Sequence, residues 1–161
     1  MFGLKKKSSF KVVAPISGVC QPLTTVNDDV FSKKMVGDGF VLKPDETANT
    51  VVSPIDATVE MLPDSKHAIG IKSVNTPIEL LVHIGLDTVK LNGTGFKALV
   101  KQGDQVKAGQ PVIKFDPQVM AKQKLDMSTM VIFTAGYQQP IDLGSKYQQQ
   151  VTAGQTLLIA K

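Results

Sequence analysis

Short apolar runs alternate with clusters of glycine, proline, asparagine and aspartate along nearly the whole chain. From Lys11 onward these clusters return roughly every 8–12 residues, a spacing typical of an all-β sandwich or barrel. Helical signals are few. Asp116 followed by Pro117 predicts the start of a short helix that continues to about Leu125, and residues 95–100 predict another helical turn or two. We therefore predict an antiparallel β-sandwich or barrel with a few short helical turns.

Two motifs each occur twice, in the order first, first, second, second. The first motif is APISGV at residues 14–19 and SPIDATV at 53–59, and the second is VKAGQPVI at 106–113 and VTAGQTLL at 151–158. Repeats this few and this far apart do not make a solenoid, in which each unit packs only on its neighbours. They predict one closed β core built from two interleaved, related halves. Their glycines are expected where the backbone needs a positive φ or a close approach.

The chain length of 161 residues favours a single domain, which we place at residues 11–161. Residues 1–10 read as a flexible basic arm, because three adjacent lysines follow only a few apolar residues. Such an arm makes at most weak contact with an anionic membrane, at about 1 kcal/mol per lysine. The chain has no apolar run near the roughly 18 residues of a membrane span, so a cytoplasmic protein is expected. The single cysteine, Cys20, excludes an internal disulfide.

The basic residues narrow the function further. All 18 are lysine, arginine and tryptophan are absent, and 6% of the residues are aromatic. Nucleic-acid readers depend on arginine at base edges and on aromatic stacking platforms. The composition therefore argues against a nucleic-acid partner. Any phosphate chemistry must also proceed without an arginine clamp from this chain.

The chain has only two histidines, His67 and His83. β-like runs at residues 67–72 and 78–84 flank a segment of turn composition, which predicts a hairpin centred on Asn75. Residues equidistant from Asn75 then face each other, so His67 pairs with His83 with Cβ atoms about 4.5–5.5 Å apart. A slip of one residue leaves the pair diagonal, whereas a slip in one strand alone places the rings on opposite faces.

Two adjacent imidazoles can divide a chemical task. One attacks through a free ring nitrogen, and the other donates a hydrogen bond to the group that the first acquires. A phosphoryl group fits, because it brings a charge of about −1.5 to −2 and strong acceptor oxygens. Ser65, two residues before His67, is placed to extend the network. A histidine on its own is usually structural or merely exposed, and it is the predicted pairing that favours a functional interpretation.

Zinc binding is an alternative function for such a pair of histidines. Two imidazoles fall short of the three or four ligands that zinc takes. Asp87 stays open as a third ligand, as does a metal site completed by a partner protein. We expect neither a cofactor nor a metal held by this chain alone, and the His-x-His pair of a zinc hydrolase is missing from the sequence.

The stretch around the second histidine, LLVHIGLDTV at residues 80–89, resembles the phosphohistidine signature of a known family. Residues 65–68 (SKHA), 30–39 (VFSKKMVGDG) and 14–18 (APISG) resemble its other segments. The family is the glucose-class enzyme IIA component of the bacterial phosphoenolpyruvate-dependent sugar phosphotransferase system. The resemblance runs from about residue 11 to residue 160.

This resemblance implies a β-sandwich of the duplicated hybrid motif type and a phosphotransferase relay. The histidine-phosphocarrier protein would donate a phosphoryl group to His83, with His67 as the partner imidazole. His83 would pass the group to a cysteine in the IIB domain of a membrane sugar transporter, and from there it would reach the sugar. Ser65 occupies a position where many members carry threonine, and it keeps the hydroxyl.

The resemblance also implies a docking surface around the histidines. Asp28 and Asp87 match acidic positions near the family's site, where a carboxylate weakens the phosphorylated state and selects partners. For Asp28 a plain turn role is equally well supported. Four apolar residues are expected to contact partners: Val30, Phe31, Ile69 and Leu81. An alternative function uses the same surface as a regulatory module, whose phosphorylation state other enzymes or transporters read.

Overall fold

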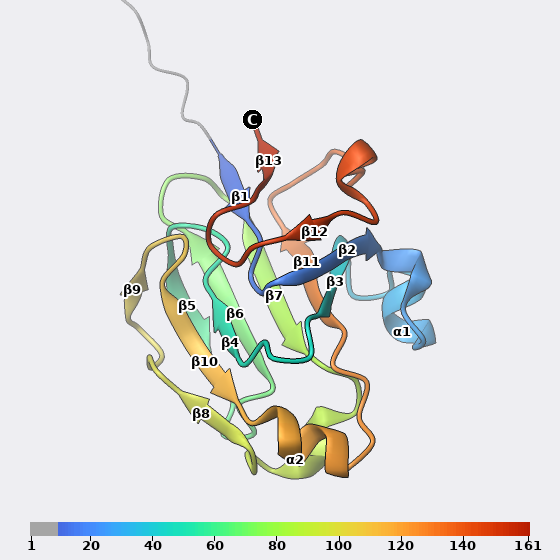
Figure 1. The fold of residues 1–161 in the computed structure, drawn as a ribbon. Coiled ribbons are helices and arrows are strands. Elements are labelled where there is room, and N and C mark those ends of the chain that lie inside the picture. Colours follow the sequence, from blue (N-terminus) through green and yellow to red (C-terminus); the bar gives the residue numbers. More distant parts are fainter. Residues whose placement is uncertain (1–9) are drawn as a thin grey trace, which may run out of the picture.

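The structure, a computed structural model, describes residues 10–161, and most of its regular secondary structure is short antiparallel strands (Figure 1). The largest sheet has the strand order β12-β2-β3-β11-β7-β6-β5-β9. In chain order its strands are β2 (Gly18–Pro22), β3 (Asp38–Pro44), β5 (Ala57–Met61), β6 (Ala68–Ser73), β7 (Glu79–Ile84), β9 (Gln105–Val106), β11 (Thr129–Ala135) and β12 (Gln150–Val151). The predicted all-β class is thereby confirmed.

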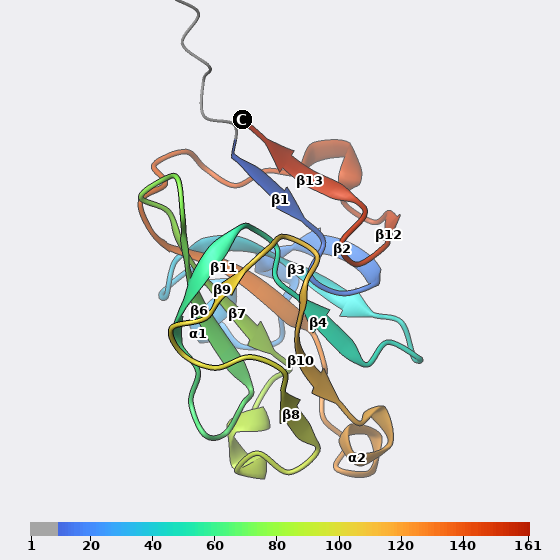
Figure 2. The same cartoon turned by 90° about the vertical axis from the view of Figure 1, so that its left-hand side faces the viewer.

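Two smaller sheets complete the sandwich. The first has the order β4-β10-β8 and is formed by β4 (Thr50–Val52), β8 (Phe96–Ala98) and β10 (Pro111–Phe115). The second pairs β1 (Lys11–Val13) with β13 (Leu157–Ala160). Figures 1 and 2 show the three-stranded sheet facing the larger one, with β1 and β13 side by side at the end where the chain terminates.

The helices are short and lie outside the sheets. They are α1 (Asp29–Ser32) and α2 (Pro117–Lys122), with 3-10 turns η1 (Leu23–Thr25), η2 (Thr88–Leu91) and η3 (Gly144–Lys146). The Asp116 side chain accepts a hydrogen bond from the Gln118 backbone N–H at 2.9 Å, which caps α2 as the Asp-Pro pair predicts. Among the described residues no helix is long and apolar enough to cross a membrane.

The main core lies between the facing sheets, and the alternation of strand residues selects which side chains enter it. Along β7, Leu80, Val82 and Ile84 are buried in this core, whereas Leu81 and His83 are half-buried. The core is closed on the other side of the sandwich by β10 and β8, which contribute Ile113, Phe115 and Phe96 among others. His83 therefore projects from the outer face of the large sheet.

A second apolar cluster covers part of that outer face. It consists of Leu23, Val26, Val41, Leu86, Met130 and Ile132, with Phe31 and Leu81 packed against it. Because the segment from η1 through α1 contributes several of these side chains, it is anchored over β3 and β11. This anchoring brings α1 next to the end of β7.

The first pair of repeats meets in the fold through matching hydrogen bonds. The Val13 N–H donates to the Pro54 carbonyl at 2.9 Å, and the Val52 N–H donates to the Pro15 carbonyl at 2.8 Å. Each bond thus joins the residue before one repeat to the proline of the other. This is the arrangement expected of two interleaved, related halves.

The second pair of repeats joins the first in the same symmetric way. The Gly109 N–H donates to the Ser53 carbonyl and the Gly154 N–H donates to the Ala14 carbonyl, both at 2.8 Å. Both glycines have a positive φ, 89° at Gly109 and 73° at Gly154, and a Cβ added to Gly154 would lie 3.2 Å from the Gly109 Cα. The predicted use of these glycines, a positive φ or a close approach, is confirmed: both have a positive φ, and Gly154 also makes a close approach.

One helical prediction is wrong. Residues 96–98, expected in a helical turn, form strand β8, which pairs with β10 so that Phe96 lies opposite Phe115. The two rings pack edge to face with centroids 6.3 Å apart. Burial of Phe96 against the facing sheet outweighs the weak local tendency to form a turn.

The predicted arm extends one residue too far into the domain. The Phe10 N–H donates to the Lys161 carbonyl and the Lys161 N–H donates to the Phe10 carbonyl, both at 2.9 Å. The Phe10 ring is buried, with its centroid 6.4 Å from that of Phe133. Phe10 therefore belongs to the sandwich. The rest of the predicted arm, with its three lysines, lies outside the described residues.

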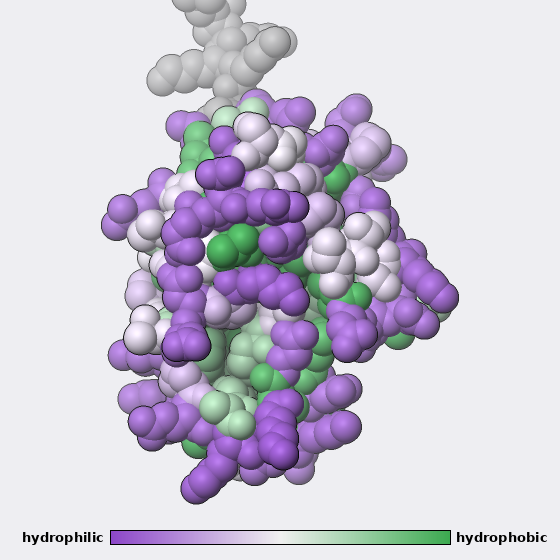
Figure 3. Space-filling view, turned by 45° about the vertical axis from the view of Figure 1, so that its right-hand side comes forward, coloured by the Kyte–Doolittle hydropathy of each residue, from purple (hydrophilic) through white to green (hydrophobic). Residues whose placement is uncertain are grey.

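Figure 3 shows a hollow in one side of the surface with hydrophobic side chains at its base. Beside α2 a groove of about 430 Å³ is bordered by β3, the segment after it and α2 itself. Its lining includes Ala48, Phe115, Met120, Leu125 and Met127. The Met127 side chain also packs against the turn that follows β7, next to Gly85.

Candidate functional site

The two histidines come from the hairpin of β6 and β7, but its register differs by one residue from the prediction. The Ser73 N–H donates to the Ile78 carbonyl at 2.9 Å, so the loop comprises residues 74–77 and is not centred on Asn75. The Ser73 hydroxyl donates to Asn75 Oδ1 at 3.0 Å within this loop. Ala68 consequently lies opposite His83, and the predicted direct pairing of His67 with His83 is wrong.

The imidazoles nevertheless lie side by side, as predicted, by a different route. His67 lies in a bend just before β6, after Lys66, whose φ is 54°. Its carbonyl accepts a hydrogen bond from the Ile84 N–H at 2.7 Å. The ring centroids of His67 and His83 are 5.1 Å apart and the ring planes are 81° apart. The bend compensates for the shifted register, because a regular ladder would send the two side chains to opposite faces.

The hydrogen bond of His83 determines which of its ring nitrogens is free. His83 Nδ1 lies 2.9 Å from the Gly85 carbonyl oxygen. A carbonyl oxygen can only accept, so Nδ1 carries the hydrogen and the neutral ring keeps its lone pair on Nε2. Sequence reasoning missed Gly85, although a glycine two residues after the histidine was a signal. Its φ of 78° is one that other residues rarely adopt.

Burial keeps His83 neutral. The pKa of His83 is lowered from 6.5 to about 4 by desolvation and, to a smaller extent, by the neighbouring His67, whereas the Gly85 carbonyl and the Asp28 carboxylate act in the opposite direction. Desolvation is the largest of these influences. At neutral pH the ring is therefore uncharged, and Nε2 is available as a nucleophile.

His67 is linked to Ser65, as predicted. The Ser65 hydroxyl and His67 Nδ1 are 2.6 Å apart. Burial lowers the pKa of His67 as well. When the hydroxyl donates to Nδ1, the hydrogen of the neutral ring lies on Nε2. His67 is then a donor beside a ring whose own Nε2 is an acceptor, which gives the pair unlike roles.

Of the four apolar residues expected to contact partner proteins, some lie at the surface and one lies in the core. The Phe31 ring packs against the His83 ring with centroids 4.8 Å apart, and Val30 beside it is 44% exposed. Leu81 is half-buried against the second cluster. Ile69 is only 1% exposed, so its proposed contact with partners is wrong: alternation along β6 turns this residue into the main core.

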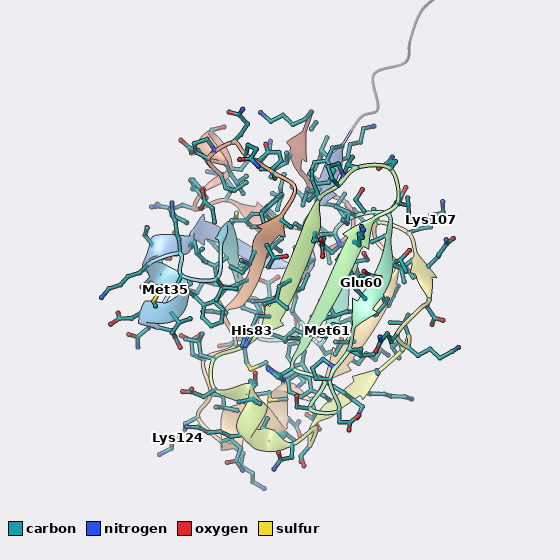
Figure 4. All side chains as sticks on the ribbon, turned by 180° about the vertical axis from the view of Figure 1, so that it is seen from behind. Met35, Glu60, Met61, His83, Lys107 and Lys124 are labelled. Atoms are coloured by element: carbon teal, nitrogen blue, oxygen red, sulfur yellow. The ribbon has the colours of Figure 1, made fainter. Side chains whose placement is uncertain are left out.

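Figure 4 shows His83 at the end of β7, between Met35 next to α1 and Met61 on β5. Met35 is 72% exposed and Met61 is 44% exposed. Together with Val30 they place uncovered apolar side chains on both sides of the histidine. An exposed apolar surface around a polar centre is typical of a site that meets other proteins.

The two acidic residues occupy different places. Asp28 caps α1, since its Oδ1 accepts a hydrogen bond from the Val30 N–H at 2.9 Å. Its carboxylate also raises the pKa of His83, so both of its expected roles have support. Asp87 is exposed at the start of η2 with a φ of 60°. Within residues 10–161, no three side chains of the types His, Cys, Asp and Glu form a cluster suited to a metal ion.

A β-sandwich that carries two uncharged, adjacent imidazoles at an apolar surface has the features of a protein that carries a small group on a histidine nitrogen. The comparisons with known proteins agree. Residues 10–139 match the family model of the phosphoenolpyruvate-dependent sugar phosphotransferase system, EIIA 1. The chain belongs to this family, and it is accordingly a phosphocarrier component of a sugar phosphotransferase system.

Similar proteins include both separate and fused components. The chain is 38% identical over 161 residues to the glucose-specific EIIA component of Staphylococcus epidermidis, covering 99% of this chain and 95% of the relative. It is 43% identical over 122 residues to a glucose-specific EIIBCA component of Corynebacterium glutamicum, covering 76% of this chain and 18% of that protein. The glucose permease IIA structure from Mycoplasma capricolum superimposes with a TM-score of 0.84 at 32% identity, covering 99% of this chain and all of the other.

Proposed function

We propose that the chain accepts a phosphoryl group on His83 Nε2 from the histidine-phosphocarrier protein and donates it to a cysteine in the IIB domain of a sugar transporter. The observation that carries this proposal is the pairing of a free Nε2 on His83 with the neighbouring ring of His67. The EIIBCA name of the Corynebacterium relative supports the choice of acceptor, because it joins an A component to B and C components in one chain.

The transfer is a displacement at phosphorus. The lone pair of His83 Nε2 forms the new N–P bond while the bond from phosphorus to the donor's imidazole breaks and leaves its electron pair on the donor nitrogen. His83 gains positive character as it reacts, and the hydrogen bond from Nδ1 to the Gly85 carbonyl strengthens accordingly. His67, oriented by Ser65, donates to an oxygen of the incoming group.

The test uses the purified donor system. With phosphoenolpyruvate, enzyme I and the histidine-phosphocarrier protein, the wild-type chain becomes labelled and the His83→Ala variant does not. Labelling that persists in His83→Ala contradicts the proposal. His67→Ala still accepts the phosphoryl group but passes it on poorly, and equal transfer by this variant and the wild type contradicts the role of His67. A panel of IIB domains then identifies the acceptor.

A second candidate function is regulation through the same surface. The exposed Val30 side chain lies in α1 next to Phe31, whose ring packs on His83, and Met35 is exposed just after α1. A phosphoryl dianion on His83 therefore disfavours any partner that buries this surface. Enzymes or transporters that bind only one form would then sense the state of the relay. Binding assays with phosphorylated and unphosphorylated chain test this function, and identical partners for both forms contradict it.

A further inference from the structure

Two consecutive peptide groups lie just after His83: the one between Ile84 and Gly85 and the one between Gly85 and Leu86. In each, both the carbonyl and the N–H form a hydrogen bond. In the first, the Ile84 carbonyl accepts a hydrogen bond from Thr88 Oγ1 at 2.6 Å. The N–H of the same peptide group, on Gly85, donates to the Ser128 carbonyl at 3.0 Å. A peptide group is planar, so bonds on opposite sides fix its rotation.

The second peptide group contains the carbonyl that holds His83. The Gly85 oxygen accepts the hydrogen of His83 Nδ1, and the N–H at the other side, on Leu86, donates to the Asp126 carbonyl at 2.7 Å. Rotation of this peptide group would withdraw the acceptor from Nδ1. The ring hydrogen could then move to Nε2, which would remove the lone pair that the proposed transfer needs.

The turn of residues 126–128, which supplies the Asp126 and Ser128 carbonyls, is itself held by side-chain hydrogen bonds. Asp126 Oδ1 accepts hydrogen bonds from the Ser128 N–H at 2.9 Å and from the Ser128 hydroxyl at 2.6 Å. Thr88 and Ser128 are also among the few buried polar side chains of the described residues. A buried hydroxyl destabilises the fold unless it forms a hydrogen bond. Here the Thr88 hydroxyl bonds to the Ile84 carbonyl, and the Ser128 hydroxyl bonds to Asp126.

Close packing limits movement further. A Cβ added to Gly85 would lie 2.6 Å from the Thr88 methyl carbon and 2.8 Å from Met127 Sδ. Met127 belongs to the same turn, between the two residues whose carbonyls hold Gly85 and Leu86. Thr88 therefore contacts the site twice, through its hydroxyl to Ile84 and through its methyl group next to Gly85.

We infer that Thr88 and the turn of residues 126–128 act as a brace that holds the Gly85 carbonyl in place and thereby keeps the hydrogen of His83 on Nδ1. Thr88 and Ser128 are positioning residues, because they act on His83 through the backbone. This inference rests on the proposed function of His83. It goes beyond that function by assigning the control of the reactive nitrogen to residues outside the histidine pair.

The test replaces the hydroxyl of Thr88 and measures the ring directly. In Thr88→Val the shape is kept and the bond to Ile84 is lost, so long-range ¹H–¹⁵N spectra should show His83 molecules with the hydrogen on Nε2. The rate of phosphoryl acceptance at saturating donor should fall about 10-fold with an unchanged KM, because the docking surface is intact. Thr88→Ser keeps the hydroxyl and should restore the wild-type spectrum and most of the rate.

The control is Ser53→Ala. Ser53 is also buried, and its hydroxyl donates to the Ile55 carbonyl at 2.7 Å, which belongs neither to the braced peptide groups nor to the turn of residues 126–128. This variant should keep the wild-type His83 spectrum. An equal change in Ser53→Ala, or a wild-type spectrum and rate in Thr88→Val, overturns the inference.

Ser128→Ala keeps the inference testable if Thr88→Val does not fold. It removes only the hydroxyl bond to Asp126, so the same spectral change should appear to a smaller degree, and an unchanged spectrum counts against the brace. The spectra need no phosphoryl donor. A wild-type chain that is never phosphorylated would therefore refute the proposed function without affecting this result.

Discussion

Burial of His83 couples its protonation to folding. Its pKa is about 4 in the folded chain against 6.5 ordinarily, so the unfolded chain takes up the proton first as the pH falls. The free energy of unfolding should be insensitive to this group above about pH 6.5 and decrease between pH 6.5 and 4, by at most about 3 kcal/mol. Urea unfolding at several pH values measures the slope.

The control for this pH dependence is His83→Gln. Its free energy of unfolding should fall less steeply over the same window, with the remaining slope including the contribution of His67, whose pKa is lowered in the same direction. Parallel curves for the variant and the wild type would show that His83 is protonated as readily in the folded chain as in the unfolded one.

At the residue scale, local spacing predicted part of the site. The scarcity of histidine and the turn composition around Asn75 were enough to bring His67 and His83 together, and the Ser65 bond to His67 followed from their separation of two residues. Thr88 and Ser128 were not predicted. The hydrogen bonds from Gly85 and Leu86 to the turn of residues 126–128 join segments some 40 residues apart, which leave no local pattern. The Thr88 bond to Ile84 spans only four residues, but its importance depends on that distant turn.

At the scale of the element, a substitution at Asp28 can separate its two roles, the cap of α1 and the negative charge near His83. Asn caps a helix about as well as Asp, so Asp28→Asn should keep α1 and remove only the charge beside His83. The phosphorylated form should then be favoured up to about fivefold, corresponding to roughly 1 kcal/mol of relieved repulsion. The equilibrium of the phosphoryl group between donor and chain measures this effect.

Asp28→Ala is the matched variant, because it loses the cap as well. It should show the same phosphoryl shift together with a loss of about 1 kcal/mol in unfolding free energy. If Asp28→Asn leaves the phosphoryl equilibrium unchanged, Asp28 serves only the turn that begins α1.

Two element predictions failed, one because of hydrogen bonds within the hairpin loop and one because of a tertiary contact. The hairpin register shifted because hydrogen bonds of Ser73 enclose residues 74–77 as the loop. β8 replaced a predicted helical turn because Phe96 is buried opposite β10. By contrast, α2 begins where Asp116 and Pro117 predicted it, since capping depends on adjacent residues alone.

At the scale of the whole molecule, the repeats were the most informative signal. Four segments, recognised only by their similarity, meet at one junction, where Gly109 and Gly154 make equivalent hydrogen bonds to Ser53 and Ala14. Similarity between distant segments records a relation between halves of the fold. It therefore predicted a long-range arrangement that hydrophobic periodicity alone does not encode.

The same junction predicts unequal costs for equivalent substitutions. Alanine at Gly109 or Gly154 must adopt a positive φ, at about 1–2 kcal/mol. The Cβ at position 109 would meet its nearest atom at 3.6 Å, an ordinary contact, whereas at position 154 it would lie 3.2 Å from the Gly109 Cα. Gly103 has a φ of 95° with nothing within 4 Å of an added Cβ, so it isolates the backbone strain.

Urea unfolding should therefore rank the variants. Gly103→Ala and Gly109→Ala should lose similar free energies of unfolding, and Gly154→Ala should lose more, because backbone atoms of the other half must move to admit its Cβ. Unfolding should stay a single transition in all three variants, since the halves are interleaved and share one core. A loss at Gly154 no larger than that at Gly103 would mean that the junction yields easily, and separate transitions would mean that the halves fold independently.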